Sequence, residues 1–182
     1  GRLEALLNFQ TVICELTGLP LANCSLLDEA TAAAEAVTMF HGSRSRAQVK
    51  AEANTVFVDE NVFASTLAVI HTRMIPQGIQ VVVGDYKKFE FTPDVFAAIV
   101  QFPNADGSIE DYKEFVARAG AAGAKVGVAA DLMSLVLLTP PGEWGGYLLR
   151  AIRREKASQA ALRYPDVLRG SFRRFLRYEG RL

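Results

Sequence analysis

The chain has 182 residues, 50% of them hydrophobic, and its 20 Lys and Arg are balanced by 20 Asp and Glu. This length and apolar content are enough for one domain with a sizeable core. No apolar run approaches the roughly 18 residues that span a bilayer, and no basic segment with an apolar core begins the chain, so we expect neither a membrane span nor a secretory signal.

Only two cysteines, Cys14 and Cys24, are present. They do not make the disulfide framework of a small secreted protein, so a reducing compartment is expected. The first residue is Gly rather than Met, and we therefore expect the natural start to lie upstream.

Two helices are predicted near the N-terminus. Residues 2–16 form an amphipathic helix because apolar residues recur at three- and four-residue spacing on one face, namely Leu3, Leu6, Leu7, Ile13 and Leu16. Gly18 and Pro20 end it, since Gly tolerates a left-handed residue and Pro cannot continue a helix. A second helix is predicted from Asp28 to Phe40, with Asp28 and Glu29 at its positive end.

The middle of the chain alternates strands with helices. The predicted strands are 55–58, 79–83, 97–102 and 125–130, and the predicted helices between them are 63–74 and 108–121, with turn residues at 103–107. This alternation implies right-handed crossovers and a largely parallel sheet covered on both faces. Two further helices are predicted at 147–158 and 165–178.

The charge is unevenly distributed. Residues 1–146 hold ten Lys and Arg against seventeen Asp and Glu, whereas residues 147–182 hold ten against three. This predicts a boundary near Gly145, with an α/β unit over 1–146 and a basic helical tail over 147–182. The tail has no recognised nucleic-acid module, so we expect no nucleic-acid partner. Its apolar residues either pack on the sheet or form an exposed patch: Phe172, Phe175 and Leu176.

Four collinear stretches resemble one enzyme family. They are GRLEALLNFQTVICELTGLPLANCSLLDEATAAAEAVTMFHGSR (1–44), VFVDENVFASTLAVIHTRMIPQGIQVVVGDY (56–86), AAIVQFPNADGSIEDYKEFVARA (97–119) and GAKVGVAADLMSLVLLTPPGEWG (123–145). The family is the glycine cleavage system P-protein, the glycine dehydrogenase (decarboxylating). The resemblance is to its N-terminal half, in truncated form. It implies an α/β, three-layer, mostly parallel sheet: an incomplete large domain of the pyridoxal-phosphate-dependent transferase type I class.

The resemblance also implies a chemistry. The family decarboxylates glycine on pyridoxal phosphate, which acts as an electron sink, and passes the aminomethyl group to the lipoyl carrier H-protein. The family's Schiff-base lysine lies in the C-terminal half, in a His-Lys motif near a glycine-rich phosphate loop. None of the six lysines here matches that motif: Lys50, Lys87, Lys88, Lys113, Lys125 and Lys156. We therefore expect no catalytic, cofactor-binding or metal-binding residue in this chain, and no activity from the chain alone.

Two segments that are usual in the family are expected to be missing from this chain. The family has a Tyr-Thr-Pro-Tyr-Gln-like stretch before the point where Gly1 begins, and a strand with a glycine-rich segment after GEWG. Instead, IRREKAS (152–158) resembles a later family segment. We interpret this as an internal deletion that joins distant parts; from Gln159 onward no resemblance is found.

Several residues have both a functional and a structural reading. Ser25 and Thr31 flank the start of the second helix, where a related fold holds phosphate, but we favour the reading that they satisfy local backbone donors. Asp131 follows a strand, where an aspartate of this superfamily pairs with the pyridinium nitrogen. Without a lysine and a phosphate loop, we favour a helix cap or a contact between subunits. Asp85, after another strand, is equally ambiguous.

Neither the histidines nor the glycine-rich segment indicates a ligand site. His41 and His71 have no partners at metal-ligand spacing, so we predict ordinary histidines. The segment 120–125 resembles a phosphate loop, but it is predicted to follow a helix and precede a strand, the reverse of the required order.

We therefore expect a part of a glycine dehydrogenase (decarboxylating) that uses glycine, the catalytic C-terminal half and H-protein as partners, without membrane or nucleic acid. Its location would be the bacterial cytoplasm or the mitochondrial matrix. Two alternatives stay open: a non-catalytic assembly subunit that packs on the catalytic half, and a gene fragment without function.

Overall fold

The centre of the molecule is a five-stranded parallel sheet with the strand order β2-β1-β3-β4-β5. The computed structural model describes residues 1–22 and 26–149. The strands are β1 (Thr55–Asp59), β2 (Gln80–Gly84), β3 (Val95–Phe102), β4 (Lys125–Ala130) and β5 (Tyr147–Leu149). Every pair of neighbouring strands is parallel, as the alternation of apolar strands and helices predicts.

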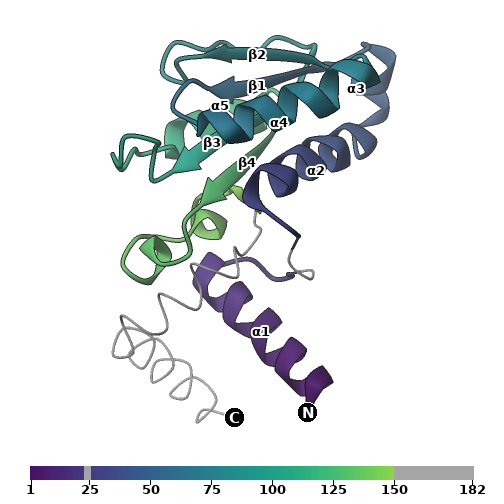
Figure 1. Cartoon of the computed structure of the whole chain (residues 1–182). Helices are drawn as coiled ribbons and strands as arrows, with labels where there is room; N and C mark the ends of the chain where they lie inside the picture. The colour runs from purple at the N-terminus through teal and green to yellow at the C-terminus, as the bar shows by residue number, and fades with distance from the viewer. Residues whose placement is uncertain (23–25, 150–182) are drawn as a thin grey trace.

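Helices cover both faces of the sheet, which makes three layers (Figure 1). Along β3, Ala97 and Ile99 pack in one core cluster with α2 (Glu29–Gly42) and α4 (Ala64–Met74). Their neighbours Ala98 and Val100 point to the other face and pack with α5 (Lys113–Ala121). Because side chains of a strand alternate between faces, this division follows directly from the sheet. All eight residues of β3 are buried.

Helix α2 packs closely because its inner face carries small side chains. Ala33, Ala34 and Val37 are all fully buried. The short helix α3 (Arg46–Lys50) was not predicted; it begins with a capping box in which Ser45 and Gln48 exchange hydrogen bonds. Three 3-10 turns complete the described elements: η1 (Ile75–Gln77), η2 (Ser134–Val136) and η3 (Pro141–Trp144).

Helix α1 (Arg2–Thr17) extends away from the sheet (Figure 1). It ends at Gly18 in the left-handed conformation (φ 68°), as the Gly–Pro signal predicts. Only its C-terminal half packs against the rest of the described chain: Ile13 and Thr17 are buried, whereas residues 1–8 are all exposed. Close backbone approach fixes this end, because a Cβ on Gly142 of η3 would collide with the carbonyl oxygen of Gly18.

Two helix predictions are wrong at their first residues. The helix predicted from Ser108 starts instead at Lys113, because Asp106 Oδ1 accepts hydrogen bonds from the backbone N–H and the hydroxyl of Ser108 and holds a turn there. Tyr147, predicted as the start of a helix, begins strand β5 alongside Gly127 of β4. The rest of the predicted tail, 150–182, lies outside the described residues.

No helix within residues 1–22 and 26–149 is both long and apolar enough to cross a membrane.

Candidate functional site

The sheet reverses its winding direction between β1 and β3. The chain leaves β1 toward β2 on one side, and leaves β3 toward β4 on the other. In open α/β sheets, ligands bind outside the carboxyl ends of the strands at such a switch point. The residues at these ends are therefore the place to look for chemistry in this chain.

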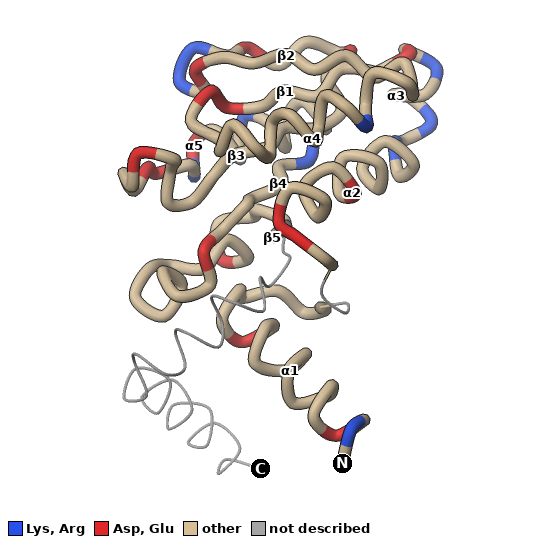
Figure 2. Tube along the Cα trace, in the orientation of Figure 1, with Lys and Arg blue, Asp and Glu red and all other residues tan. Residues whose placement is uncertain are grey.

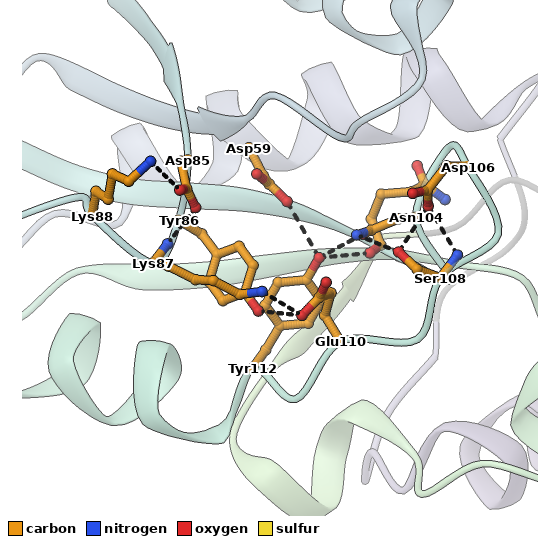
Figure 3. A network of polar contacts seen from close by, with 11 residues as sticks. Asp59, Asp85, Tyr86, Lys87, Lys88, Asn104, Asp106, Ser108, Glu110 and Tyr112 are labelled. Atoms are coloured by element: carbon orange, nitrogen blue, oxygen red, sulfur yellow. Dashed lines mark hydrogen bonds and ion pairs between the residues drawn. The ribbon is translucent and has the colours of Figure 1, made fainter.

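A buried polar group occupies the switch point (Figure 3). Asp59 is the last residue of β1 and is 0% exposed; Tyr112, just before α5, is 1% exposed. Tyr112 Oη lies 2.6 Å from Asn104 Oδ1, 3.1 Å from the carbonyl oxygen of Gln101 and 3.3 Å from Asp59 Oδ2. A phenol has one proton to donate, so these three acceptors compete for it.

Because of this competition, hydrogen bonding does not fully offset the cost of burying the Asp59 carboxyl. Its second oxygen, Oδ1, has no hydrogen-bond partner among the residues that the structure describes. Burial raises the pKa of Asp59 above its ordinary value; the hydrogen bond from Tyr112, and the backbone N–H groups of Asn61 and Tyr86, lower it only in part. Burial also raises the pKa of the Tyr112 phenol, with the nearby Asp59 charge adding to the effect.

A second polar group lies closer to solvent (Figure 3). Tyr86 Oη donates to Glu110 Oε2 at 2.7 Å, and Lys87 Nζ lies 3.0 Å from the same oxygen. The hydrogen bond from Tyr86, followed by that from Lys87, lowers the pKa of Glu110. Arg118 donates to the carbonyl oxygens of Tyr86 and Phe89 and so fastens the loop after β2 onto α5.

These contacts fill the switch point with the chain's own side chains. Tyr112 and Asn104 are both nearly inaccessible, and the ring of Tyr86 lies against that of Tyr112 with centroids 4.7 Å apart. A group that acts as a nucleophile or base must reach a substrate. Asp59 and Tyr112 are enclosed, so the arrangement fits a structural bridge between β1, β3 and α5.

The helix N-terminus that was considered as an anion site is also filled. Asp28 caps α2: its Oδ1 accepts from the Thr31 N–H at 2.7 Å and its Oδ2 accepts from the Thr31 hydroxyl at 2.8 Å. These hydrogen bonds lower the pKa of Asp28, so its charge occupies the positive end of the helix. Thr31 thus satisfies a local cap, while Ser25 lies outside the described residues.

The other candidate carboxylates hold turns. Asp131 is exposed after β4, where its Oδ1 accepts from the Met133 N–H at 3.4 Å and its backbone carbonyl accepts from the Ser134 hydroxyl. Asp85 follows β2, accepts from the Lys87 N–H at 2.9 Å, and pairs with Lys88 at 3.1 Å. The structure brings neither carboxylate into the group around Tyr112.

The histidines and lysines are spread over the molecule. His41 Nε2 lies 3.0 Å from Asn54 Oδ1, and His71 lies on α4. Lys125 Nζ donates to Ser43 Oγ at 2.6 Å at the end of α2. Within the described part of the chain, no cluster of His, Cys, Asp and Glu could hold a metal ion. The segment 120–125 runs from the end of α5 into β4, as predicted. Lys156 lies outside the described residues.

The group around Tyr112 was not predicted from the sequence. Asp59 ends a buried apolar strand, and this position was its only signal in the sequence. The residues that Asp59 contacts depend on which strands are neighbours in the sheet, and the order of elements along the chain does not show this.

The comparisons agree on one family. A family profile described as "Glycine cleavage system P-protein" matches residues 1–149. A glycine dehydrogenase (decarboxylating) from Bacteroides fragilis is 66% identical over 145 residues, which are 80% of this chain and 15% of that protein. One from Nostoc punctiforme is 53% identical over 145 residues, 80% of this chain and 14% of the relative. The chain therefore spans about a seventh of the length of these relatives.

Solved structures give the same result for the fold. An inhibitor-bound glycine decarboxylase (P-protein) of the glycine cleavage system superposes with a TM-score of 0.68 at 33% identity, over 79% of this chain and 32% of that chain. A methionine gamma lyase from Micromonospora echinospora superposes with a TM-score of 0.55 at 23% identity, over 72% and 34%. The fold is that of the large α/β domain of pyridoxal-phosphate-dependent type I enzymes, as predicted.

Proposed function

The chain belongs to the glycine cleavage system P-protein family, and on that premise we propose that it is a non-catalytic part of a glycine dehydrogenase (decarboxylating). The whole enzyme would decarboxylate glycine and pass the aminomethyl group to the lipoyl carrier H-protein. The observation that carries this proposal is the 66% identity over 145 residues with a protein of that name. Because these relatives are bacterial, the bacterial cytoplasm is the proposed location rather than a mitochondrial matrix.

We propose that pyridoxal phosphate is held elsewhere in the enzyme, since the described residues do not fit it. A phosphate at the start of α2 would meet the Asp28 carboxylate, which already accepts the Thr31 N–H of that helix. Lys125 and Asp131 lie at opposite ends of β4, a six-residue strand about 20 Å long. They are too far apart to hold the two ends of one cofactor ring. The Schiff-base lysine is therefore expected from other polypeptide.

The role left to this chain is structural. The bridge of Asp59, Tyr112 and Asn104 fixes the carboxyl edge of the sheet. This supports an assembly role on the catalytic half over a fragment without function, because the described residues build a buried apolar core on each face of the sheet.

Borohydride reduction after incubation with pyridoxal phosphate tests the proposal. We expect mass spectrometry of the folded chain to show no stable adduct beyond that of a denatured control. The purified chain should also fail to exchange carbon dioxide with glycine. A full-length relative serves as the positive control for both assays. Stoichiometric labelling of one lysine, such as Lys125 or Lys156, in the folded chain would contradict the proposal.

A further inference from the structure

The chain turns sharply between Asn104 and Ser108, just after β3 (Figure 3). The Gly107 N–H donates to the carbonyl oxygen of Asn104 at 2.9 Å, and the Asn104 N–H donates to that of Ser108 at 2.9 Å. Gly107 has a φ of 87°, which glycine adopts without strain. Asp106 and Gly107 are both exposed, and a Cβ on Gly107 would meet no heavy atom within 4 Å. The tip of this turn is therefore open to water and can open locally without displacing packed side chains.

Asp106 differs from two comparable aspartates in the residue that follows it. Asp85, Asp106 and Asp111 each accept a hydrogen bond from the backbone N–H two residues later, at 2.9, 2.9 and 3.1 Å. Tyrosine follows Asp85 and Asp111, whereas Asp106 is the one aspartate of the sequence that glycine follows. A side chain on the following residue shields its backbone nitrogen. Glycine has no Cβ, so it leaves that nitrogen accessible to the carboxyl carbon of the aspartate.

An aspartate and glycine in this order can rearrange with water as the only reagent. The Gly107 nitrogen attacks Cγ of the protonated Asp106 side chain: the C–N bond forms, the Cγ–OH bond breaks, and the hydroxyl leaves with the nitrogen's proton as water. The cyclic succinimide then takes up water. Attack at the main-chain carbonyl carbon of Asp106 breaks the original peptide bond and leaves isoaspartate, whereas attack at Cγ restores aspartate. The product has the mass of the starting chain, and nothing is oxidised or reduced.

We propose that Asp106 is a site of spontaneous isomerisation to isoaspartate in the folded chain, and that Ser108 sets its rate. The Ser108 hydroxyl donates to Asp106 Oδ1 at 2.7 Å, so the carboxyl must rotate away from Ser108 before the Gly107 nitrogen attacks it. The reaction needs only water and this chain, so it goes beyond the proposed function and does not depend on it.

The modified turn would loosen the buried group around Tyr112. Isoaspartate carries the main chain through Cβ and Cγ, which lengthens the turn and leaves the free carboxylate on Cα. That carboxylate lies closer to the main chain and loses its hold on Ser108. Ser108 Oγ accepts from Asn104 Nδ2 at 3.2 Å, and Asn104 Oδ1 lies 2.6 Å from Tyr112 Oη. Opening of the turn therefore separates Asn104 from Tyr112.

Incubation of the folded chain at neutral pH, sampled over several weeks, tests the proposal. Trypsin releases residues 89–113 as one peptide that contains Asp94, Asp106 and Asp111. Electron-transfer fragmentation of this peptide distinguishes isoaspartate from aspartate at each position. We expect isoaspartate to accumulate at Asp106 and not at Asp111. Ser108→Ala should raise the rate roughly twofold to tenfold, because it removes one hydrogen bond that restrains the carboxyl.

Asp106→Glu is the matched control, because glutamate would have to close a larger ring and should stay unmodified. Urea unfolding of the aged samples measures the consequence: the midpoint should fall as isoaspartate accumulates in the parent and stay constant in Asp106→Glu. An equal fall in both chains would refute the link to Tyr112.

Three results would overturn the proposed site. They are equal isoaspartate at Asp106 and Asp111, a Ser108→Ala rate no higher than that of the parent, and an Asp106 that stays unmodified in the folded chain while the chain in urea is converted. In the last case the native turn would block the reaction rather than restrain it.

Discussion

Tyr112 places one phenolic proton among three oxygen acceptors in a site closed to water. A buried acceptor that loses its donor keeps the full penalty of desolvation, whereas the net gain from a made hydrogen bond is smaller. The Tyr112 hydroxyl is therefore worth more to this fold than its distances alone indicate, because Asp59, Asn104 and the β3 backbone all depend on it.

Removal of that hydroxyl should destabilise the chain. We expect Tyr112→Phe to lower the free energy of unfolding by about 2–3 kcal/mol, because Asp59 and Asn104 lose their shared donor. Tyr86→Phe is the matched control; Lys87 still pairs with Glu110 there, so its cost should stay below about 1 kcal/mol. Urea unfolding measures both, and equal costs would refute the special role of Tyr112.

Asp59 predicts a distinctive pH dependence. Its pKa is raised in the folded state, so the folded chain binds its proton more tightly than the unfolded chain does. Between the two pKa values, the Asp59 contribution to stability falls as pH rises, by at most about 1.4 kcal/mol per pH unit. Asp28 and Glu110 have lowered pKa values, so their contributions act oppositely and are lost as pH falls.

The Asp59→Asn variant isolates this effect. Its new side-chain amide accepts from Tyr112 but carries no charge, so the stability of the variant relative to the parent should rise from pH 4 to pH 7. Urea unfolding at pH 4, 5.5 and 7 gives the difference at each pH. A constant difference across these values would show that Asp59 does not titrate differently in the two states.

At the scale of elements, hydrophobic periodicity gave most of the fold. The parallel sheet and the helices at 29–42 and 64–74 are confirmed. The predicted start of α5 was wrong because the acidic residues 110 and 111, suited to a first helical turn, follow an aspartate turn, and the helix begins only at Lys113. Strand β5 was missed because a three-residue strand carries too little periodicity, and it forms only beside Gly127.

The candidate site was less predictable than the elements. Thr31 and Asp131 could be placed at a helix start and a strand end from local pattern. The contact of Asp59 with Tyr112, 53 residues later, depends on strand order and on the turn that delays α5. Long-range pairing of this kind leaves no mark in local composition.

The contact between α1 and η3 can be tested with one methyl group. Gly142→Ala would place a Cβ against the carbonyl oxygen of Gly18, so we expect a loss of about 1–3 kcal/mol from overpacking. Gly120→Ala, within α5 and with open space around its Cα, should instead gain about 0.5 kcal/mol through helix propensity. Thermal unfolding compares the two; a tolerated Gly142→Ala would mean that α1 can move away freely.

At the scale of the whole molecule, charges of both signs lie at the carboxyl ends of the strands (Figure 2). Asp59 ends β1, and Asp85 and Asp131 follow β2 and β4, but Lys87 and Lys88 lie at the same edge and pair with Glu110 and Asp85. Lys125, at the start of β4, instead donates to Ser43 at the end of α2. The ion pairs therefore neutralise part of the acidic charge where the strands finish.

Strand β2 forms one edge of this sheet and exposes valines on both faces. Val82 is 40% and Val83 is 41% exposed. An apolar edge invites pairing with another chain, and natural edges carry lysine to prevent it. We expect Val83→Lys to reduce aggregation on heating while changing stability by less than about 0.5 kcal/mol.

Its register partner on β1 provides the control. Val58 is 0% exposed, so Val58→Lys should prevent folding by burying an unpaired charge. Light scattering during heating measures aggregation, and circular dichroism at about 20 °C shows whether each variant folds. If Val83→Lys aggregates as the parent does, β2 is not the edge through which chains associate.

The contact between α1 and η2 cannot form until most of the described chain has been synthesised. Helix α1 ends at Thr17, but η2, against which it packs, begins only at Ser134. A ribosome that adds about 5–20 residues per second needs roughly 6–23 s to make the intervening chain. Throughout that interval, Ile13 and Thr17 lack the surface that buries them in the folded chain. The end of α1 can therefore be fixed in place only after β1 to β4 have all been made.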